Sequence, residues 1–302
     1  MQAVLAISLG ALLLDRLLGE PPRWHPLVGF GRLAQWLESR LHAPTIGRGT
    51  VAAALLLLPP VGIAMAVSTS GGKEAFDLLI LYLALGGRSL EQHALAVRAA
   101  LEQNDLPSAR RAVACLVSRE TTLLDREGVS RAAVESVLEN GNDAVFGSLF
   151  WFLVAGAPGV VLHRLANTLD ALWGYRIPRY EAFGKPAARL DDLLNWIPAR
   201  LTALSYALVG DTRTALACWR CQGTRWKSPN AGPVMAAGAG ALGIRLGGPA
   251  HYHGREEPRP ALGRGRPPRP GDIDRALRLI RRAVGVWLLV PACGVLIAHG
   301  LA

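Results

Sequence analysis

The sequence has little charge, few aromatic residues, and very little cysteine or lysine. Charged residues make up 19% of its 302 residues and aromatic residues 6%, whereas 51% are hydrophobic. Soluble domains carry about 25% charged residues, so the shortage of charge argues against an ordinary water-soluble protein. The hydrophobic content excludes disorder over most of the chain, and four cysteines are too few for a disulfide scaffold. We therefore expect a helical membrane protein with polar loops.

The basic residues are nearly all arginines. The net charge is +10, and the only lysines are Lys73, Lys185 and Lys227. A basic chain raises the possibility of nucleic-acid binding. However, the arginines are spread along the whole sequence, and no aromatic residues alternate with them in a stacking pattern. Arginines that flank apolar segments fit an anionic lipid surface better, so we predict a lipid bilayer as partner and no nucleic acid.

Six stretches are apolar enough to enter a membrane. A spanning helix needs about 20 mostly apolar residues. The predicted segments lie near residues 1–18, 50–72, 76–87, 144–162, 197–210 and 283–301. For the shorter stretches, a buried core helix remains the alternative. We predict an all-α, polytopic integral membrane bundle with polar cytosolic loops and helices.

One tract has a low-complexity composition. Residues 254–271 are mostly arginine, proline and glycine, a composition typical of flexible or extended chain. The sequence shows no internal repeat, so we predict a single domain over residues 1–302.

Three acidic residues recur at helical spacing before the segment 144–162. Glu135, Glu139 and Asp143 are each four residues apart, which places them on one stripe of a helix. Like charges at this spacing repel, so a cation or arginines from elsewhere should offset them. Carboxylates of this kind suit Mg²⁺, which usually takes one or two of them plus substrate phosphates. A solvated helix face is the plain alternative.

Residues 167–200 mix charges of both signs beside apolar segments. Asp191 and Asn195 are one helical turn apart and share a face. Arginine binds phosphate bidentately, and carboxylates hold the metal that bridges phosphates. The charged and amide residues of this region include Asn167, Asp170, Arg176, Arg179, Lys185, Arg189, Asp191, Asp192, Asn195 and Arg200. The region therefore predicts a polyanion-plus-metal site, with an interhelical salt-bridge network as the alternative.

Two further groups carry weaker signals. Residues 228–232, Ser-Pro-Asn-Ala-Gly, precede a run rich in glycine and alanine that permits close helix packing or anion binding by the backbone. They are not a P-loop, because the Gly-Lys-Ser/Thr ending is absent. Cys218 and Cys221 with His251 and His253 are a poor zinc pattern, because no second Cys-x-x-Cys exists.

A series of motifs runs through nearly the whole chain. Its segments are 15–26 (DRLLGEPPRWHP), 88–90, 117–121 (VSRET), Glu135, 139–140, Asp143, 167–170 (NTLD), 174–175, Tyr180, 183–184, 188–192 (ARLDD), 195–202 (NWIPARLT), 228–232 and 246–249. In this order the motifs resemble those of the CobD or CbiB family of cobalamin biosynthesis, and the longest run, from Ala188 to Thr202, is highly specific. Asn142, Glu120 and Pro233 depart from the family pattern.

The resemblance implies an adenosylcobinamide-phosphate synthase in the cell inner membrane, multi-pass, with its active site facing the cytoplasm. Such an enzyme uses ATP and Mg²⁺ to join the carboxylate of adenosylcobyric acid to (R)-1-amino-2-propanol phosphate, or to aminopropanol or ethanolamine phosphate, through an acyl phosphate. Its implied partners are the corrinoid, the amino-alcohol phosphate and the bilayer. A homo-oligomer and contacts with other corrinoid-pathway enzymes are open possibilities. The alternative is an AmpE-like membrane signalling protein without synthase activity.

The residues expected to carry this chemistry fall into three groups. Glu135 is the expected acceptor of the amine's proton. The predicted catalytic residues are Glu135, Arg189, Asp191, Asp192 and Arg200. The predicted cofactor-binding residues are Arg119, Asn167, Asp170, Asn195, Ser228 and Asn230, and the predicted metal ligands are Glu139, Asp143 and Asp170.

A topological conflict follows from this assignment. If residues 144–162 cross the membrane once, the polar residues before and after them lie on opposite sides. Gly156, Pro158 and Gly159 would permit a re-entrant segment instead. A deeper bundle that includes residues 197–210 is the other solution.

Overall fold

The computed structural model describes residues 2–21, 23, 25–252 and 255–300, with the backbone alone for 252, 255 and 294–300. Several predicted positions lie outside the described residues: Met1, Pro22, Trp24, His253, Gly254 and Leu301. The described chain is mostly helical, which confirms the all-α class. It divides into two compact units, which we describe separately. The first comprises Met1–Gly86, Asp143–Trp196 and Pro291–Ala302, and the second comprises Gly87–Asn142 and Ile197–Val290.

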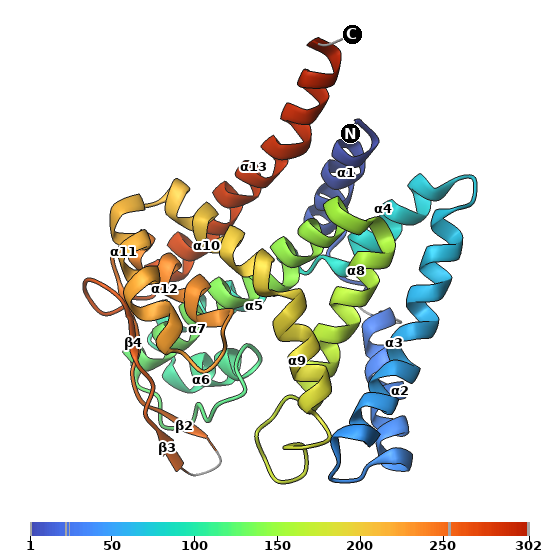
Figure 1. Ribbon diagram of the computed structural model, residues 1–302. Helices are drawn as coiled ribbons and strands as arrows, with labels where there is room; N and C mark the ends of the chain where they lie inside the picture. The colour runs from blue at the N-terminus through green and yellow to red at the C-terminus, as the bar shows by residue number, and fades with distance from the viewer. Residues whose placement is uncertain (1, 22, 24, 253–254, 301–302) are drawn as a thin grey trace. The chain divides into compact units, whose positions relative to one another are not determined.

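The first unit is built from helices. They are α1 (Gln2–Leu18), α2 (Pro26–Leu41), α3 (Ile46–Ser68), α4 (Lys73–Ala84), α8 (Gly147–Trp173) and α9 (Lys185–Leu194). Helices α3, α8 and α9 pack against one another (Figure 1). Their core includes Leu56, Leu57, Leu169, Trp173 and Phe183, all at most 4% exposed. This packing fixes the last turns of α8 and all of α9, where the predicted polar residues lie.

Helix α8 is interrupted at Gly156. This residue has φ +61° and ψ −152°, a conformation that is essentially restricted to glycine. Pro158 follows two residues later and lacks the N–H that would continue the helix. The break lies within the predicted segment 144–162, where glycine and proline suggested a re-entrant turn. It makes two helical pieces, of which the first, residues 147–155, spans only about 14 Å at 1.5 Å per residue.

Two helices have the length and composition to cross a membrane, among the residues that the structure describes. They are Ile46–Ser68 and the stretch Arg126–Trp173, which contains the break at Gly156. The first includes most of the predicted segment 50–72, and the second includes 144–162. Helix α3 also exposes Leu55, Leu58 and Ile63, each more than half accessible. The remaining predicted segments fall on helices that do not meet these criteria, so the polytopic topology stays a prediction.

The second unit combines helices with four three-residue strands. Its helices are α5 (Gly87–Glu102), α6 (Leu106–Ala114), α7 (Arg126–Gly141), α10 (Trp196–Val209), α11 (Thr212–Gln222), the 3₁₀ turn η2 (Gly223–Arg225), α12 (Ala231–Leu242) and most of α13 (Gly271–Gly300). The strands are β1 (Arg245–Gly247), β2 (Ala250–Tyr252), β3 (Arg255–Glu257) and β4 (Ala261–Gly263). Strand β1 pairs with β4 and β2 with β3, both antiparallel. Beside these strands, α12 packs against α11 and β4.

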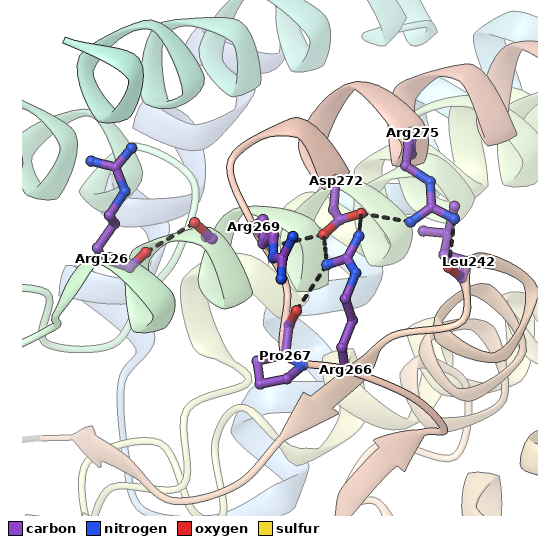
Figure 2. A network of polar contacts seen from close by, with 8 residues as sticks. Arg126, Leu242, Arg266, Pro267, Arg269, Asp272 and Arg275 are labelled. Atoms are coloured by element: carbon purple, nitrogen blue, oxygen red, sulfur yellow. Dashed lines mark hydrogen bonds and ion pairs between the residues drawn. The ribbon is translucent and has the colours of Figure 1, made fainter. Parts of the chain in front are cut away.

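The basic tract expected over residues 254–271 contains two of these strands and ends on a buried carboxylate. Asp272, 1% exposed, accepts hydrogen bonds from the Arg266 and Arg275 guanidinium groups and from the backbone N–H of Arg269 (Figure 2). Burial alone would raise the pKa of Asp272, but these bonds lower it below the ordinary value. The flexibility of the tract stays a prediction.

A five-residue π-helical segment, Asn142–Phe146, joins α7 to α8. It lies at the point of the chain where the second unit gives way to the first. The buried Asn142 accepts a hydrogen bond at Oδ1 from Thr202 Oγ1, at 2.9 Å. Such π segments are rare and often occur at functional sites. Asn142, one of the departures from the family pattern, thus fastens the end of α7 to α10.

Candidate active site: a carboxylate cluster and an arginine-bound glutamate

Asp191, in the last turn of α9, organises the polar side chains of the first unit. Its Oδ1 accepts hydrogen bonds from Asn167 Nδ2 at 3.3 Å and from Asn195 Nδ2 at 3.0 Å. Asn195 Oδ1 lies 3.1 Å from His163 Nε2. Because Asn195 donates through Nδ2, its Oδ1 is the acceptor, so the histidine hydrogen is on Nε2. The predicted shared face of Asp191 and Asn195 is confirmed.

Negative charge accumulates around Asp191. Burial, followed by the nearby carboxylates of Asp143 and Asp170, raises the pKa of Asp191 to about 8, although its amide hydrogen bonds act in the opposite direction. Burial also raises the pKa of Asp192, while Arg189 and Arg176 oppose that shift. A carboxyl group with this environment holds its proton at neutral pH unless a cation takes the proton's place. The cluster is therefore suited to binding a cation.

Arg164 is the positive charge closest to this cluster in the first unit's hydrogen-bond network, and the sequence analysis missed it. Its Nη1 donates to the Asp143 carbonyl oxygen at 3.0 Å and to Asn167 Oδ1 at 3.4 Å. The carboxylates of Asp143, Glu20 and Asp191 all attract it. Charged residues at the end of an apolar segment are a functional signal, and Arg164 directly follows residues 144–162. Glu20 belongs to the opening motif, which was used only for the family resemblance.

The position of Asp170 depends on a glycine. Asp170 is in the last turn of α8, and the Gly174 N–H donates to its carbonyl oxygen at 2.6 Å. A Cβ atom at position 174 would lie 2.0 Å from Asp170 Oδ1, closer than any real contact. The absence of a side chain at Gly174 therefore makes room for this carboxylate, which explains the Gly-Tyr motif physically.

The carboxylates fit an open magnesium site better than a closed one. Within the described ranges, no three histidine, cysteine, aspartate or glutamate side chains are close enough to hold a metal ion by themselves. Mg²⁺ in phosphate chemistry usually takes one or two carboxylates and completes its shell with phosphates and water. Asp191 with Asp143 or Asp170 would supply such carboxylates, since burial and these two neighbouring charges raise the pKa of Asp191. The absence of a three-residue metal group from the described residues does not test the zinc pattern, because His253 lies outside them.

Glu135 is the centre of a second polar group, in the second unit. Its Oε2 accepts from Arg119 Nη1 at 2.9 Å and from Arg259 Nη1 at 3.1 Å. Its Oε1 accepts from the Gly247 backbone N–H at 2.8 Å and from Arg259 Nη2 at 3.3 Å. All three side chains are at most 9% exposed. The expected neutralisation of the acidic stripe by arginines from elsewhere is thus confirmed at Glu135.

A cavity of about 130 Å³ adjoins this group. Its walls are formed by Leu116, Val117, Ser118, Arg119, Glu135, Ser136, Glu139, Asn140 and Arg259. Glu139 therefore shares the cavity with Glu135, as the helical spacing predicted. Arg259 was missed, because it lies in a tract whose composition suggested flexible chain.

The third predicted group also assembles within the second unit. Arg200 Nη1 donates to Asn230 Oδ1 at 2.6 Å. Ser228 Oγ accepts the backbone N–H of Ala231 at 3.1 Å, just where α12 begins. The structure thus brings together Arg200, Ser228 and Asn230, although 30 residues separate Arg200 from Asn230. It leaves their predicted roles as predictions.

The predicted residues consequently form separate groups within each unit. The first unit contains Asp143, Asn167, Asp170, Arg189, Asp191, Asp192 and Asn195, and the second contains Arg119, Glu135, Glu139, Arg200, Ser228 and Asn230. Each unit therefore offers its own polar chemistry, with carboxylates in excess in the first and arginines prominent in the second.

Comparison with known proteins supports a single family. A protein of Stutzerimonas stutzeri named "Cobalamin biosynthesis protein CobD" is 61% identical over 292 residues, covering 95% of this chain and 96% of that protein. Proteins of the same name from Chromobacterium violaceum and Mycobacterium tuberculosis are 57% and 42% identical, and the matches cover 92% and 89% of this chain and 92% and 88% of theirs. No solved structure matches the chain.

The family model described as CobD/Cbib protein matches residues 8–280. This range includes every residue of the carboxylate cluster and of the group around Glu135. It also includes the basic tract that supplies Arg259. The resemblance of the motifs is confirmed, and the chain belongs to the CobD/Cbib family.

Proposed function

We propose that this chain is an ATP-dependent amide synthase of cobalamin biosynthesis. Membership of the CobD/Cbib family supports the pathway role, since its relatives are named as cobalamin biosynthesis proteins. The proposed reaction joins adenosylcobyric acid to (R)-1-amino-2-propanol phosphate, or to aminopropanol or ethanolamine phosphate. The product is adenosylcobinamide phosphate.

The chemistry requires an activated carboxylate, because a carboxylate and an amine do not condense at neutral pH. In the proposed route a carboxylate oxygen of the corrinoid attacks the γ-phosphorus of ATP, and ADP leaves. The amine nitrogen then attacks the acyl carbon, the C–O bond to phosphate breaks, and inorganic phosphate leaves. The amine must lose a proton in this step, so the site needs a base as well as groups that neutralise phosphate.

The carboxylate cluster of the first unit is the single observation that carries this proposal. Mg²⁺ bound there would supply charge neutralisation for the transferring phosphoryl group. Asp191 would hold it together with Asp143 or Asp170, and Asn167 and Asn195 fix the Asp191 carboxylate in place. The positive charge of Arg189 opposes the rise in the pKa of the neighbouring Asp192. The Arg189 guanidinium would bind phosphate oxygens.

The amine's proton acceptor is proposed to come from the second unit. Glu135 was the predicted base, but both of its carboxylate oxygens already accept hydrogen bonds, from two arginines and a backbone N–H. Glu139 lines the same cavity and is the better candidate. We therefore propose that Glu135 orients the two arginines and that Glu139 accepts the proton.

A membrane location is part of the proposal. The exposed leucines of α3 would be costly in water and favourable in lipid. The two apolar helices support membrane association, while the multi-pass arrangement in the inner membrane and the cytoplasmic orientation of the site are proposed from the family resemblance and from the location of ATP.

The test is an ADP-release assay on purified membranes that contain the protein. Adenosylcobyric acid and Mg-ATP are supplied with and without aminopropanol phosphate, and the corrinoid product is identified by mass. Release that needs both substrates, together with an amide product, supports the synthase. No release from well-inserted protein with any of the proposed amines would reject it in favour of an AmpE-like signalling protein.

A further inference from the structure

Arg259 belongs to the Arg/Pro/Gly tract, yet each nitrogen atom of its guanidinium group donates a hydrogen bond within the protein. Its Nη atoms bind Glu135, and its Nε donates to the Gly248 carbonyl oxygen at 2.9 Å. The guanidinium also lies 5.1 Å from the centroid of the Trp226 ring. A cation over an aromatic face in a desolvated place is a strong, directional contact. Several interactions therefore hold this arginine beside the cavity.

Arg119 completes a pair of guanidinium groups around one carboxylate. Its side chain is 5% exposed, and its buried Nε has no hydrogen-bond partner. A buried N–H without a partner carries a free-energy cost, which a ligand acceptor would remove. Two arginines facing one glutamate also leave one positive charge uncompensated within the triad. Both observations point to an anionic acceptor in the adjoining cavity.

We infer that Arg119 and Arg259 bind the phosphate group of a small phosphate monoester in this cavity. Guanidinium forks match the geometry of phosphate oxygens, and Ser118 and Ser136 add hydroxyl groups to the wall. Glu139, on the same wall, suits an ammonium group at the other end of the ligand. The inference rests on the proposed function for the identity of the ligand, an amino-alcohol phosphate, and makes Arg259 a further binding residue.

The size of the cavity favours a small ligand over a nucleotide. At about 130 Å³ it is well below the roughly 300–1,000 Å³ of pockets that enclose drug-sized molecules. ATP is the other source of phosphate in the reaction, so the experiment must separate the two.

The experiment measures binding to detergent-solubilised, full-length protein by calorimetry, with O-phosphoethanolamine, ethanolamine and Mg-ATP as separate probes. We expect O-phosphoethanolamine to bind and Arg259→Met to weaken it about tenfold or more, since hydrogen bonds to charged groups are lost. Arg259→Lys keeps the positive charge but not the forked guanidinium. Its affinity for O-phosphoethanolamine should lie between those of the unaltered protein and Arg259→Met. The control is Arg264→Met, which removes an exposed arginine of the same tract and should change nothing.

The ratio of the affinities for O-phosphoethanolamine and ethanolamine distinguishes a binding role of Arg259 from a purely structural one. If Arg259 only stabilises the fold, Arg259→Met lowers the unfolding temperature but leaves the preference for O-phosphoethanolamine over ethanolamine unchanged, which would overturn the inference. If Arg259→Met loses binding of Mg-ATP but not of O-phosphoethanolamine, the inference is also overturned, in favour of a nucleotide site.

The same proteins separate this inference from the proposed synthase. Binding of O-phosphoethanolamine that depends on Arg259, in membranes that form no amide, would reject the synthase and keep the binding site. Amide formation with an unchanged KM for the amine phosphate in Arg259→Met would keep the synthase and reject the binding site.

Discussion

Asp191, which is half-buried, and Glu135, which is buried, are each the centre of a polar group, but the charges around them differ in sign. Asp191 faces two further carboxylates, and its hydrogen bonds come from neutral amides. Glu135 faces two arginines and a backbone N–H. The first arrangement would be stabilised by a cation, whereas the second has one more positive than negative charge. The comparison suggests that one unit supplies a metal-assisted phosphate site and the other a preformed anion site.

The largest effect is expected from removing the charge of Asp191. Asp191→Asn keeps the shape of the side chain but eliminates the oxygen charge that would hold Mg²⁺. Amide formation should fall by about a hundredfold or more, as is usual when one preorganised electrostatic group is lost. The measurement is product formation in membranes with matched amounts of inserted protein.

The matched control for that change is Glu74→Gln, which alters an exposed acid of the same unit. Its activity should equal that of the unaltered protein. Normal turnover in a double variant, Asp191→Asn with Asp192→Asn, would remove the carboxylate cluster from the reaction.

The next effect concerns the stability of the second unit. Glu135→Ala leaves Arg119 and Arg259 buried without their shared partner, which should cost about 3–5 kcal/mol of unfolding free energy. Glu127→Ala, on the same helix, removes a partly exposed pair with Arg131 and should cost at most about 1 kcal/mol. Denaturant unfolding in detergent measures both. If both substitutions lower the unfolding free energy equally, the difference in burial between Glu135 and Glu127 does not determine their contributions to stability.

A smaller effect should follow from adding one methyl group beside Asp170. In Gly174→Ala the new Cβ would meet Asp170 Oδ1, so the loop or the carboxylate must move. We expect a loss of about 1–3 kcal/mol in stability and a reduced affinity for Mg²⁺. Gly29→Ala is the control, because its Cβ meets no other atom within 4 Å. Unchanged Mg²⁺ binding in Gly174→Ala would argue against Asp170 as a ligand.

The last expected effect is a dependence on pH that belongs to Asp191. Because its pKa is raised to about 8 in the folded chain, Mg²⁺ must displace a proton below that pH. Mg²⁺ affinity should therefore rise by up to about tenfold per pH unit below the pKa and level off above it. Without Mg²⁺, stability should fall as pH rises from about 4 to about 8, since the folded state holds the extra proton. Calorimetric titration across this pH range measures the Mg²⁺ affinity. In Asp191→Asn the dependence of this affinity on pH should disappear.

The sequence by itself determined the helical class, the family and most of the residues that the groups contain. Apolar runs of helical length need no tertiary information, and the spacing of Asp191 and Asn195 on α9 follows from 3.6 residues per turn. The same rule placed Glu135 and Glu139 on one cavity wall. Local periodicity is a property of the chain, so it can be read without the fold.

Only the tertiary structure decided which charges meet. Glu135 and Arg259 are 124 residues apart, and Arg259 comes from a tract whose composition predicted flexibility. In the structure Arg259 lies between two short strands and contacts Trp226. Likewise Arg164 donates to the carbonyl oxygen of Asp143, which lies 21 residues earlier in the chain. Pairing between distant residues depends on packing, and neither composition nor spacing contains that information.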